Sequence, residues 1–374
     1  MEFLRRTWAE ISKSALINNL SEIKKNAAGA KICAVVKADA YGHSAKIVAP
    51  LLDAAGADWF AVSNISEAIG LREYGIKKPV LILGYTPAEY AKTLAENDIS
   101  QCVYSYEFAR LLSDCAQKAG VSVKIHIKLD TGMGRIGFDL RDSRLSGIDE
   151  AILSAKAKNL TFEGVFTHFA AADTDDGNAR EFTKGQYERF ISGIEKIKAA
   201  GLNPQIIHCD NSAAICDKEY ICDMVRPGII LYGLKPDKDF NTGINLMPAM
   251  TFKSVVSFVK DIKAGTPLSY GMTFTAPKSM KVATVAVGYA DGYQRKLSNK
   301  GEVLVRGRRA KVLGRVCMDQ ILIDVSDIEG VKMGDEVTLF GRDLSVDDVA
   351  EICGTINYEI VCDIAPRVPR ILVD

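Results

Sequence analysis

The chain has 374 residues, of which 48% are hydrophobic and 25% charged, so it can bury a large core and exceeds the usual size of one domain. Its 47 Lys and Arg residues balance 47 Asp and Glu residues, and zero net charge excludes the long-range field that a nucleic-acid-binding or basic membrane-surface protein needs. No stretch approaches the ~18 apolar residues of a membrane-spanning helix, and the first residues lack an apolar signal-peptide core. We therefore expect a cytoplasmic protein with a small-molecule partner, and neither a nucleic-acid nor a membrane partner.

Nine cysteines are scattered along the chain without a CxxC pair. This pattern fits neither a disulfide scaffold nor a zinc site. We expect most of them to be buried thiols, and we expect no metal.

Strand-like and helical segments alternate from about Ser12 to Gly233, which predicts parallel strands joined by crossover helices. Several of the helical segments end in glycine, as helix C-termini often do. Eight strands in so short a length favour a closed (β/α)8 TIM-like barrel, and an open doubly wound sheet, whose usual GxGxxG is absent, stays the alternative. The expected strands are residues 31–36, 59–63, 79–84, 100–105, 121–129, 160–169, 204–210 and 222–226.

After Pro236 the sequence pattern changes to runs of β-branched residues broken by glycine turns, such as "KVATVAVGYADG" and "GDEVTLFG". This pattern predicts a C-terminal, mostly-β domain. One short helix, "VDDVAEICG", is expected near its end.

Unusual polar residues follow the expected barrel strands, and in a parallel barrel these strand ends share one face, where chemistry is usually built. Each residue alone has a simpler interpretation, such as a solvated lysine, a hydrogen-bonded barrel histidine, a helix N-cap or a turn. Five separate strand ends make coincidence a poor explanation. The residues are Lys37, Arg135, His168, Asn211 with Ser212, and Arg226.

The loops after the last two barrel strands are the usual phosphate site of such barrels. Here they offer Ser212 at a helix start and the small backbone of Gly228 and Ile229. A phosphate at one end of the mouth and the amine of Lys37 at the other is the layout expected for pyridoxal 5'-phosphate, whose aldehyde forms a Schiff base with lysine.

Along nearly its whole length the chain resembles the alanine racemases, which are fold-type III pyridoxal-phosphate enzymes. The resemblance implies domains at residues 11–236 and 237–374, with residues 1–10 joining the latter. It also implies racemisation of alanine by two bases, D-alanine supply for peptidoglycan, and a head-to-tail homodimer with shared active sites. The matching motifs are "AVVKADAYGH", "HIKLDTGMGR", "THFAAAD", "DNSAA", "VRPGIILYG", "SYGMTF", "GYADGYQR", "GRVCMDQ" and "GTINYEI" with a terminal "RVPR".

The resemblance also implies roles for individual residues. Lys37 and Tyr270 are expected to be the two catalytic bases, Arg226 the partner of the pyridine nitrogen, and Arg135 with Met318 the contacts of the substrate carboxylate. His168 and His208 are expected to relay hydrogen bonds between Tyr270 and Arg226. The cofactor-binding set is Lys37, Tyr41, His168, Asn211, Ser212, Arg226, Gly228, Ile229 and Tyr358. Tyr289 and Asp319 are expected, with Tyr270 and Met318, to reach the active site of the other subunit.

Lys128 has two interpretations. It shares a strand face with His126 and Asp130 by period two, which favours a plain barrel ion pair. Some relatives carry a carbamylated lysine here, and a carbamate would give Arg135 an anionic partner in place of a like charge.

Three other functions stay open. A decarboxylase of the same fold is expected to carry a carboxylate at the ring nitrogen, where this chain has Arg226. A non-catalytic cofactor carrier would not need the β domain with Tyr270. Racemisation of serine or another small amino acid is not distinguished by the sequence.

Overall fold

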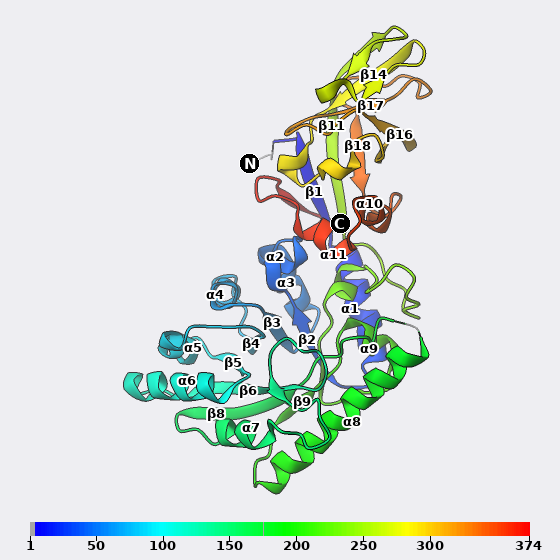
Figure 1. The fold of residues 1–374 in the computed structure, drawn as a ribbon. Coiled ribbons are helices and arrows are strands. Elements are labelled where there is room, and N and C mark those ends of the chain that lie inside the picture. Colours follow the sequence, from blue (N-terminus) through cyan, green and yellow to red (C-terminus); the bar gives the residue numbers. More distant parts are fainter. Residues whose placement is uncertain (1–3, 175) are drawn as a thin grey trace. The chain divides into compact units, whose positions relative to one another are not determined.

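The structure is a computed structural model that describes residues 4–174 and 176–374. The chain forms two compact units, and Figure 1 labels many of their helices and strands. The barrel unit comprises residues 16–40 and 45–246, and the β unit comprises residues 4–15, 41–44 and 247–374.

Eight parallel strands form the barrel unit, in the sheet order β10-β2-β3-β4-β5-β6-β8-β9. These eight match the strands expected from the sequence. Their side chains are almost entirely buried, because a strand covered on both faces is apolar along its whole length. The strands are β2 (Lys31–Val35), β3 (Trp59–Val62), β4 (Val80–Ile82), β5 (Ile99–Val103), β6 (Val123–Asp130), β8 (Leu160–Phe166), β9 (Ile206–His208) and β10 (Met224–Val225).

Backbone hydrogen bonds close the circle between β9 and β10. The N–H of Asp223 donates to the carbonyl of Ile207 at 3.0 Å, and the N–H of Arg226 donates to the carbonyl of Asp210 at 3.0 Å. The fold is thus the expected TIM-like barrel, and the alternative of an open sheet is not formed. A short strand that the sequence pattern does not reveal, β7 (Phe138–Asp139), pairs with β6.

Helices connect the strands, as the alternating pattern predicts. Side-chain caps start several of them, such as Ser105, whose hydroxyl accepts the N–H of Phe108 at 3.2 Å, and Gly120 ends the same helix in the left-handed region. Helix α1 (Lys13–Asn26) leads from the first strand of the chain into the barrel unit. The others are α3 (Ala45–Ala54), α4 (Ile65–Glu73), α5 (Ala91–Glu96), α6 (Tyr106–Ala119), α7 (Ile148–Ala155), α8 (Gly177–Ala199) and α9 (Ser212–Asp217), with 3-10 turns η1 (Ala88–Tyr90) and η2 (Ile229–Tyr232).

An eight-stranded sheet dominates the β unit, in the order β14-β17-β16-β15-β18-β11-β1-β19. The first strand, β1 (Thr7–Ser12), pairs antiparallel with β11 (Met250–Ile262) and parallel with β19 (Arg370–Val373), so both ends of the chain enter this sheet. The rest of the sheet is β14 (Met280–Val285), β15 (Glu302–Val305), β16 (Arg308–Leu313), β17 (Ile321–Asp324) and β18 (Glu336–Phe340). Helix α10 (Val346–Cys353) is the expected short helix, and α11 (Asn357–Cys362) follows it.

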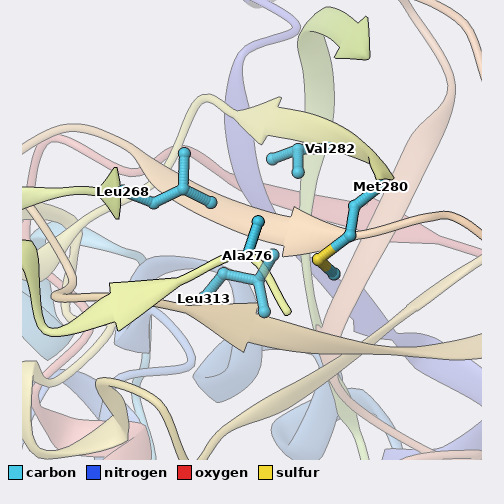
Figure 2. Close-up of a cluster of buried hydrophobic side chains, with 5 residues drawn as sticks. All are labelled: Leu268, Ala276, Met280, Val282 and Leu313. Carbon is cyan, nitrogen blue, oxygen red and sulfur yellow. The ribbon is translucent and has the colours of Figure 1, made fainter. Parts of the chain in front are cut away.

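A small apolar cluster anchors the hairpin of β12 (Pro267–Leu268) and β13 (Phe274–Thr275) to the main sheet (Figure 2). Leu268 and Ala276 bracket the loop that carries the "SYGMTF" motif, and both are buried against sheet side chains. Packing on either side of the loop fixes its two ends. The cluster consists of Leu268, Ala276, Met280, Val282 and Leu313.

Among the described residues, none of the helices has both the length and the apolar character that crossing a membrane would require.

Candidate functional site

Lys37 lies two residues beyond the last residue of β2 and is half-buried at the carboxyl end of that strand. The turn after it, labelled α2 (Lys37–Tyr41) in Figure 1, is left-handed, with φ between 51° and 56° from Ala38 to Tyr41. Four successive non-glycine residues in this region cost about 1–2 kcal/mol each, so the surroundings must impose the turn. The sequence predicts a tight turn here. It does not reveal that the turn is left-handed, because none of these four residues is glycine.

Hydrogen bonds within the barrel unit hold this turn. The N–H of Ala40 donates to the carbonyl of Val36 at 2.9 Å, and the N–H of Ala38 donates to the carboxylate of Glu67 at 2.8 Å. Asp39 accepts the N–H of Ala45 at 2.7 Å. A strained backbone that is held this firmly fixes the direction in which the Lys37 side chain leaves the strand.

The Arg226 guanidinium, just after β10, is buried with 4% of the residue exposed. Its Nη2 donates to the carbonyls of Thr167 and Cys209, at 2.8 Å each, and lies 3.4 Å from Nδ1 of His168. Its Nη1 lies 2.9 Å from Nδ1 of His208. The structure therefore brings together three of the residues expected at the site.

Both histidines beside Arg226 are neutral. Burial, reinforced by nearby positive charge, holds the pKa of His168 and of His208 well below the usual value for histidine. Because a guanidinium only donates hydrogen bonds, each ring nitrogen that faces Arg226 must be an acceptor. Arg226 is thus a fixed cation held by neutral acceptors.

A buried chain of side chains continues from His208 through the barrel. His208 Nε2 lies 2.9 Å from Nδ1 of His126, and His126 Nε2 lies 3.2 Å from the carboxylate of Glu163. The hydroxyl of Ser100 donates to the same carboxylate. Sequence reasoning missed Glu163 and gave His126 no role, although Glu163 is the one charged residue of β8 and His126 alternates with Lys128 along β6.

Ser212 and Gly228 are adjacent, as a phosphate cradle requires. The N–H of Gly228 donates to the Ser212 hydroxyl at 2.9 Å, and both residues are buried. Asn211 is the N-cap of α9, where its side chain accepts the N–H of Ala214 at 3.1 Å and donates to the carbonyl of Phe169 at 3.2 Å. The loop that follows β10 continues into η2 at Ile229.

Lys128 lies inside the barrel with 3% of the residue exposed. Its amine has no hydrogen-bond partner among the described residues and lies 4.9 Å from the centre of the Phe166 ring. The interpretation as a plain ion pair is wrong, because the Asp130 carboxylate instead accepts the N–H groups of Gly132 and Gly134 at 3.0 Å. Burial, together with the positive charge of Arg226, lowers the pKa of Lys128 to about 7.

Arg135, the other barrel residue expected to bind substrate, lies in the loop after β6 and is exposed. The structure leaves its guanidinium accessible. It contributes to the positive potential that depresses the pKa of Lys128.

In the β unit, Tyr41 and Tyr358 lie close together, with ring centroids 6.0 Å apart. Gly42, at φ +76°, packs so tightly that an added Cβ would lie 2.0 Å from the carbonyl oxygen of Val361. The carbonyl of Tyr41 lies 2.8 Å from Nδ1 of His43. Two tyrosines that the resemblance assigns to the phosphate cradle are therefore held next to each other by backbone packing.

Three loops of the β unit carry the remaining expected residues. The Ser269 hydroxyl, beside Tyr270, donates to the carbonyl of Arg315 at 2.7 Å. The N–H of Tyr289 donates to the carbonyl of Cys317 at 3.0 Å. These bonds tie the Tyr270 and Tyr289 loops to the loop of residues 314–320.

The side chains at the tips of these loops face solvent in the single chain. Tyr270 is 69% exposed, Met318 54% and Tyr289 43%. Asp319 accepts from Arg367 at 2.7 Å and is also exposed. These three loops therefore present several large exposed side chains close to one another on the β unit.

The residues present fit pyridoxal phosphate. The barrel unit supplies a lysine at a strand end, a buried cation that cannot deprotonate, and a serine hydroxyl beside glycine and helix-turn amides. These are the groups that a reactive aldehyde, a pyridine nitrogen and a phosphate would respectively need. No cluster of metal-ligating side chains occurs within the described ranges.

Comparison with known proteins yields one family. The model for the alanine racemase N-terminal domain matches residues 11–236, and the model for the C-terminal domain matches residues 249–372. Alanine racemase 2 of Caldanaerobacter subterraneus subsp. tengcongensis is 42% identical, covering 99% of this chain and 95% of its own. The alanine racemase of Desulforamulus reducens is 44% identical, covering 98% of each chain. A solved structure of alanine racemase from Clostridium difficile 630 superposes with a TM-score of 0.93 at 40% identity, covering 100% of this chain and 97% of its own.

Proposed function

Since this chain belongs to the alanine racemase family and is an alanine racemase, we propose that it interconverts L-alanine and D-alanine with pyridoxal 5'-phosphate and two opposed bases. The observation that carries the cofactor is Arg226, a buried guanidinium between two neutral histidines at the carboxyl end of a barrel strand. Such a group can hold a pyridine nitrogen without giving it a proton.

Other residues of the chain would hold the rest of the cofactor. Lys37 would bind its aldehyde, and Ser212, Gly228 and Ile229 would bind its phosphate with Tyr41 and Tyr358. Once bound, pyridoxal phosphate makes the Cα proton of an attached amino acid acidic. Asn211 supports the cradle by capping α9.

Two residues of the chain would move the proton. Racemisation requires removal of a proton from one face of Cα and delivery of another to the opposite face. Lys37 would take it from the D-isomer and Tyr270 from the L-isomer. His168 would connect Tyr270 to Arg226, and its contact with Arg226 at 3.4 Å supports that half of the relay.

The substrate carboxylate would bind to Arg135 and to the backbone of Met318. We propose that Lys128 becomes a carbamate that neutralises and orients Arg135. Its buried amine has no hydrogen-bond partner among residues 4–174 and 176–374, and its lowered pKa leaves a large neutral fraction at physiological pH. A neutral amine is the form that attacks carbon dioxide.

We propose that the active enzyme is a homodimer in which Tyr270, Tyr289, Met318 and Asp319 serve the other subunit's active site. The exposure of the first three in the single chain supports this arrangement. The product D-alanine would supply peptidoglycan synthesis in the cytoplasm.

Deuterium wash-in tests this function. The purified protein, incubated with pyridoxal phosphate in D2O, should exchange the Cα proton of L-alanine and D-alanine, and L-serine, L-lysine and L-glutamate should exchange more slowly. Lys37→Ala and Tyr270→Phe should each stop racemisation, whereas the matched control Tyr106→Phe, at a half-exposed tyrosine that starts α6, should not. Carbon dioxide release would instead favour a decarboxylase. Absence of exchange with alanine would refute the proposal.

A further inference from the structure

Glu163 is a buried carboxylate in the barrel interior that no expected role explains. It lies on β8 with 8% of the residue exposed, and its partners are His126, Ser100 and, at 4.0 Å, the amine of Lys124. Burial raises the pKa of Glu163, but the hydrogen bonds from His126 and Ser100 outweigh burial and leave that pKa below its ordinary value. The group is therefore an anion inside the barrel.

A β-bulge explains how this side chain reaches the interior. Along the β6–β8 ladder, Ile125 pairs with Phe162 and His126 pairs with Gly164, so Glu163 is the extra residue. Phe166 stacks on His208 inside the barrel at 4.8 Å, and strict alternation from Phe166 would send Glu163 to the outer face. Bulges are rare in parallel sheets and re-aim side chains next to active sites.

Gly164 makes room for the contact that the bulge creates. A Cβ at this position would lie 2.5 Å from Nδ1 of His126 and 2.9 Å from the carbonyl oxygen of Ile206. The bulge and the glycine together bring the His126 ring between Glu163 and His208. Two separate features of β8 thus serve one hydrogen-bonded chain.

With Arg226 in its observed place, donor chemistry fixes every proton in this chain. Arg226 only donates, so His208 accepts at Nδ1 and carries its proton on Nε2. That proton goes to Nδ1 of His126, which then carries its own proton on Nε2, directed at the carboxylate. In the reverse order, both rings would carry their protons on Nδ1. That order would require a protonated Glu163 and would place the Nδ1–H of His208 against the N–H of Arg226.

We propose that Glu163 is a positioning residue for Arg226, acting through His126 and His208. Its negative charge selects the one order of protons in which His208 accepts from Arg226, and so holds the guanidinium at the angle that the pyridine nitrogen meets. This inference rests on the proposed function only for that last step. The order of protons itself is a property of the chain with or without cofactor.

The test compares Glu163→Gln, Glu163→Asp and Ser100→Ala in the full-length protein. Glutamine keeps the size but removes the charge, and its amide can donate as well as accept, so both proton orders become available. Aspartate keeps the charge. Ser100→Ala is the matched control, because it removes a hydrogen bond from the carboxylate without changing the charge or the imidazoles.

The first readout is the protonation of the imidazoles. The sequence contains only four histidines, so nitrogen-15 NMR of histidine-labelled protein, with and without pyridoxal phosphate, resolves each ring. His126 and His208 should both carry the Nε2 proton in the parent, in Glu163→Asp and in Ser100→Ala. In Glu163→Gln the carboxylate no longer favours this arrangement, so a second population with Nδ1 protons should appear, in which the Arg226 guanidinium turns away from His208. Unchanged rings in Glu163→Gln would overturn the inference.

The second readout is the loaded enzyme. Glu163→Gln should lower kcat about tenfold, as loss of a group that orients a histidine does, with KM for alanine nearly unchanged. It should also shift the absorption maximum of the bound cofactor, and Glu163→Asp should recover part of the loss. Equal kcat and an unshifted spectrum in Glu163→Gln would overturn the role of Glu163 while leaving the parent's racemisation intact.

A double-mutant cycle protects the test from poor folding of one variant. His126→Phe cuts the chain while filling similar space, and adding Glu163→Gln to it should lower kcat no further. If the two substitutions instead lowered kcat by independent factors that multiply in the double variant, Glu163 would not act on Arg226 through His126. If the parent itself fails to exchange the alanine proton, the proposed function fails, and the NMR result still decides the order of protons.

Discussion

Replacing Lys128 with methionine should make the barrel more stable than the parent at neutral pH, and the advantage should fade as the pH rises. The buried amine has a pKa of about 7 in the folded chain, against an ordinary value of 10.5. Between these values the unfolded chain binds more protons than the folded chain, so the free energy of unfolding of the parent rises with pH. Methionine has similar length and no proton to lose.

The size of the effect follows from the lowered pKa of Lys128. A difference of about 3.5 pKa units, at about 1.36 kcal/mol each, corresponds to a penalty of about 5 kcal/mol when the amine must stay neutral. Most of that penalty remains at pH 7.5 and little at pH 9.5. The difference in unfolding free energy between Lys128→Met and the parent should therefore shrink by about 2.5 kcal/mol over this range.

Urea unfolding of both proteins, in buffers freed of carbon dioxide, measures this difference. Parallel stability curves from pH 7.5 to pH 9.5 would refute the reasoning that Lys128 is a buried, neutral amine. A second series at pH 8 with added bicarbonate tests the carbamate. The parent should gain stability because the carbamate forms only in the folded state, and Lys128→Met should not respond.

Three further substitutions test how the site is built. Gly42→Ala should lower the unfolding midpoint and weaken pyridoxal-phosphate binding at least tenfold in a fluorescence titration, because the new methyl group meets the Val361 carbonyl at 2.0 Å and moves the adjacent tyrosine. Gly164→Ala should displace the His126 ring and so reproduce the imidazole NMR changes expected for Glu163→Gln. Asp291→Asn should cost about 3 kcal/mol in urea unfolding, because this fully buried carboxylate pairs with two arginines.

Matched controls accompany these substitutions. Gly177→Ala introduces a methyl group with no heavy atom within 4 Å, so it should leave both stability and the NMR spectrum unchanged. Asp139→Asn breaks an exposed pair with Arg141 and should cost less than about 1 kcal/mol. If Asp291→Asn and Asp139→Asn lowered the free energy of unfolding equally, the larger contribution that we assign to the buried ion pair would be wrong.

The barrel strands could be predicted because each is a local pattern. A strand such as β3 is buried on both faces and reads as an unbroken apolar run, and the polar residue that ends it stands out. Lys37 and Arg226 were found in this way. The place of β1 could not be found by pattern, since Thr7 pairs with Ser254, and only the family resemblance indicated that the first residues join the β domain.

The interior of the barrel was harder to predict for a physical reason. The period-two rule correctly put Lys128 on one face with His126, but it could not tell that the amine would find no hydrogen-bond partner in the part of the chain that the structure describes. The same rule fails at Glu163, because one extra residue in β8 reverses which side chain faces inward. A bulge leaves no mark in composition or periodicity, and its signature is the hydrogen-bond register between two strands.

The two unexpected features of the interior have opposite charge requirements. Arg226 is a permanent cation in a buried site, which makes a second cation nearby costly and an anion favourable. Burial and, after it, the positive charge of Arg226 lower the pKa of Lys128, whereas hydrogen bonds from His126 and Ser100 keep the pKa of Glu163 low. A substitution that removes the charge of Arg226 should therefore raise the pKa of Lys128, because one of the positive charges that lower it is lost, and it should also remove the donor that His208 Nδ1 accepts from.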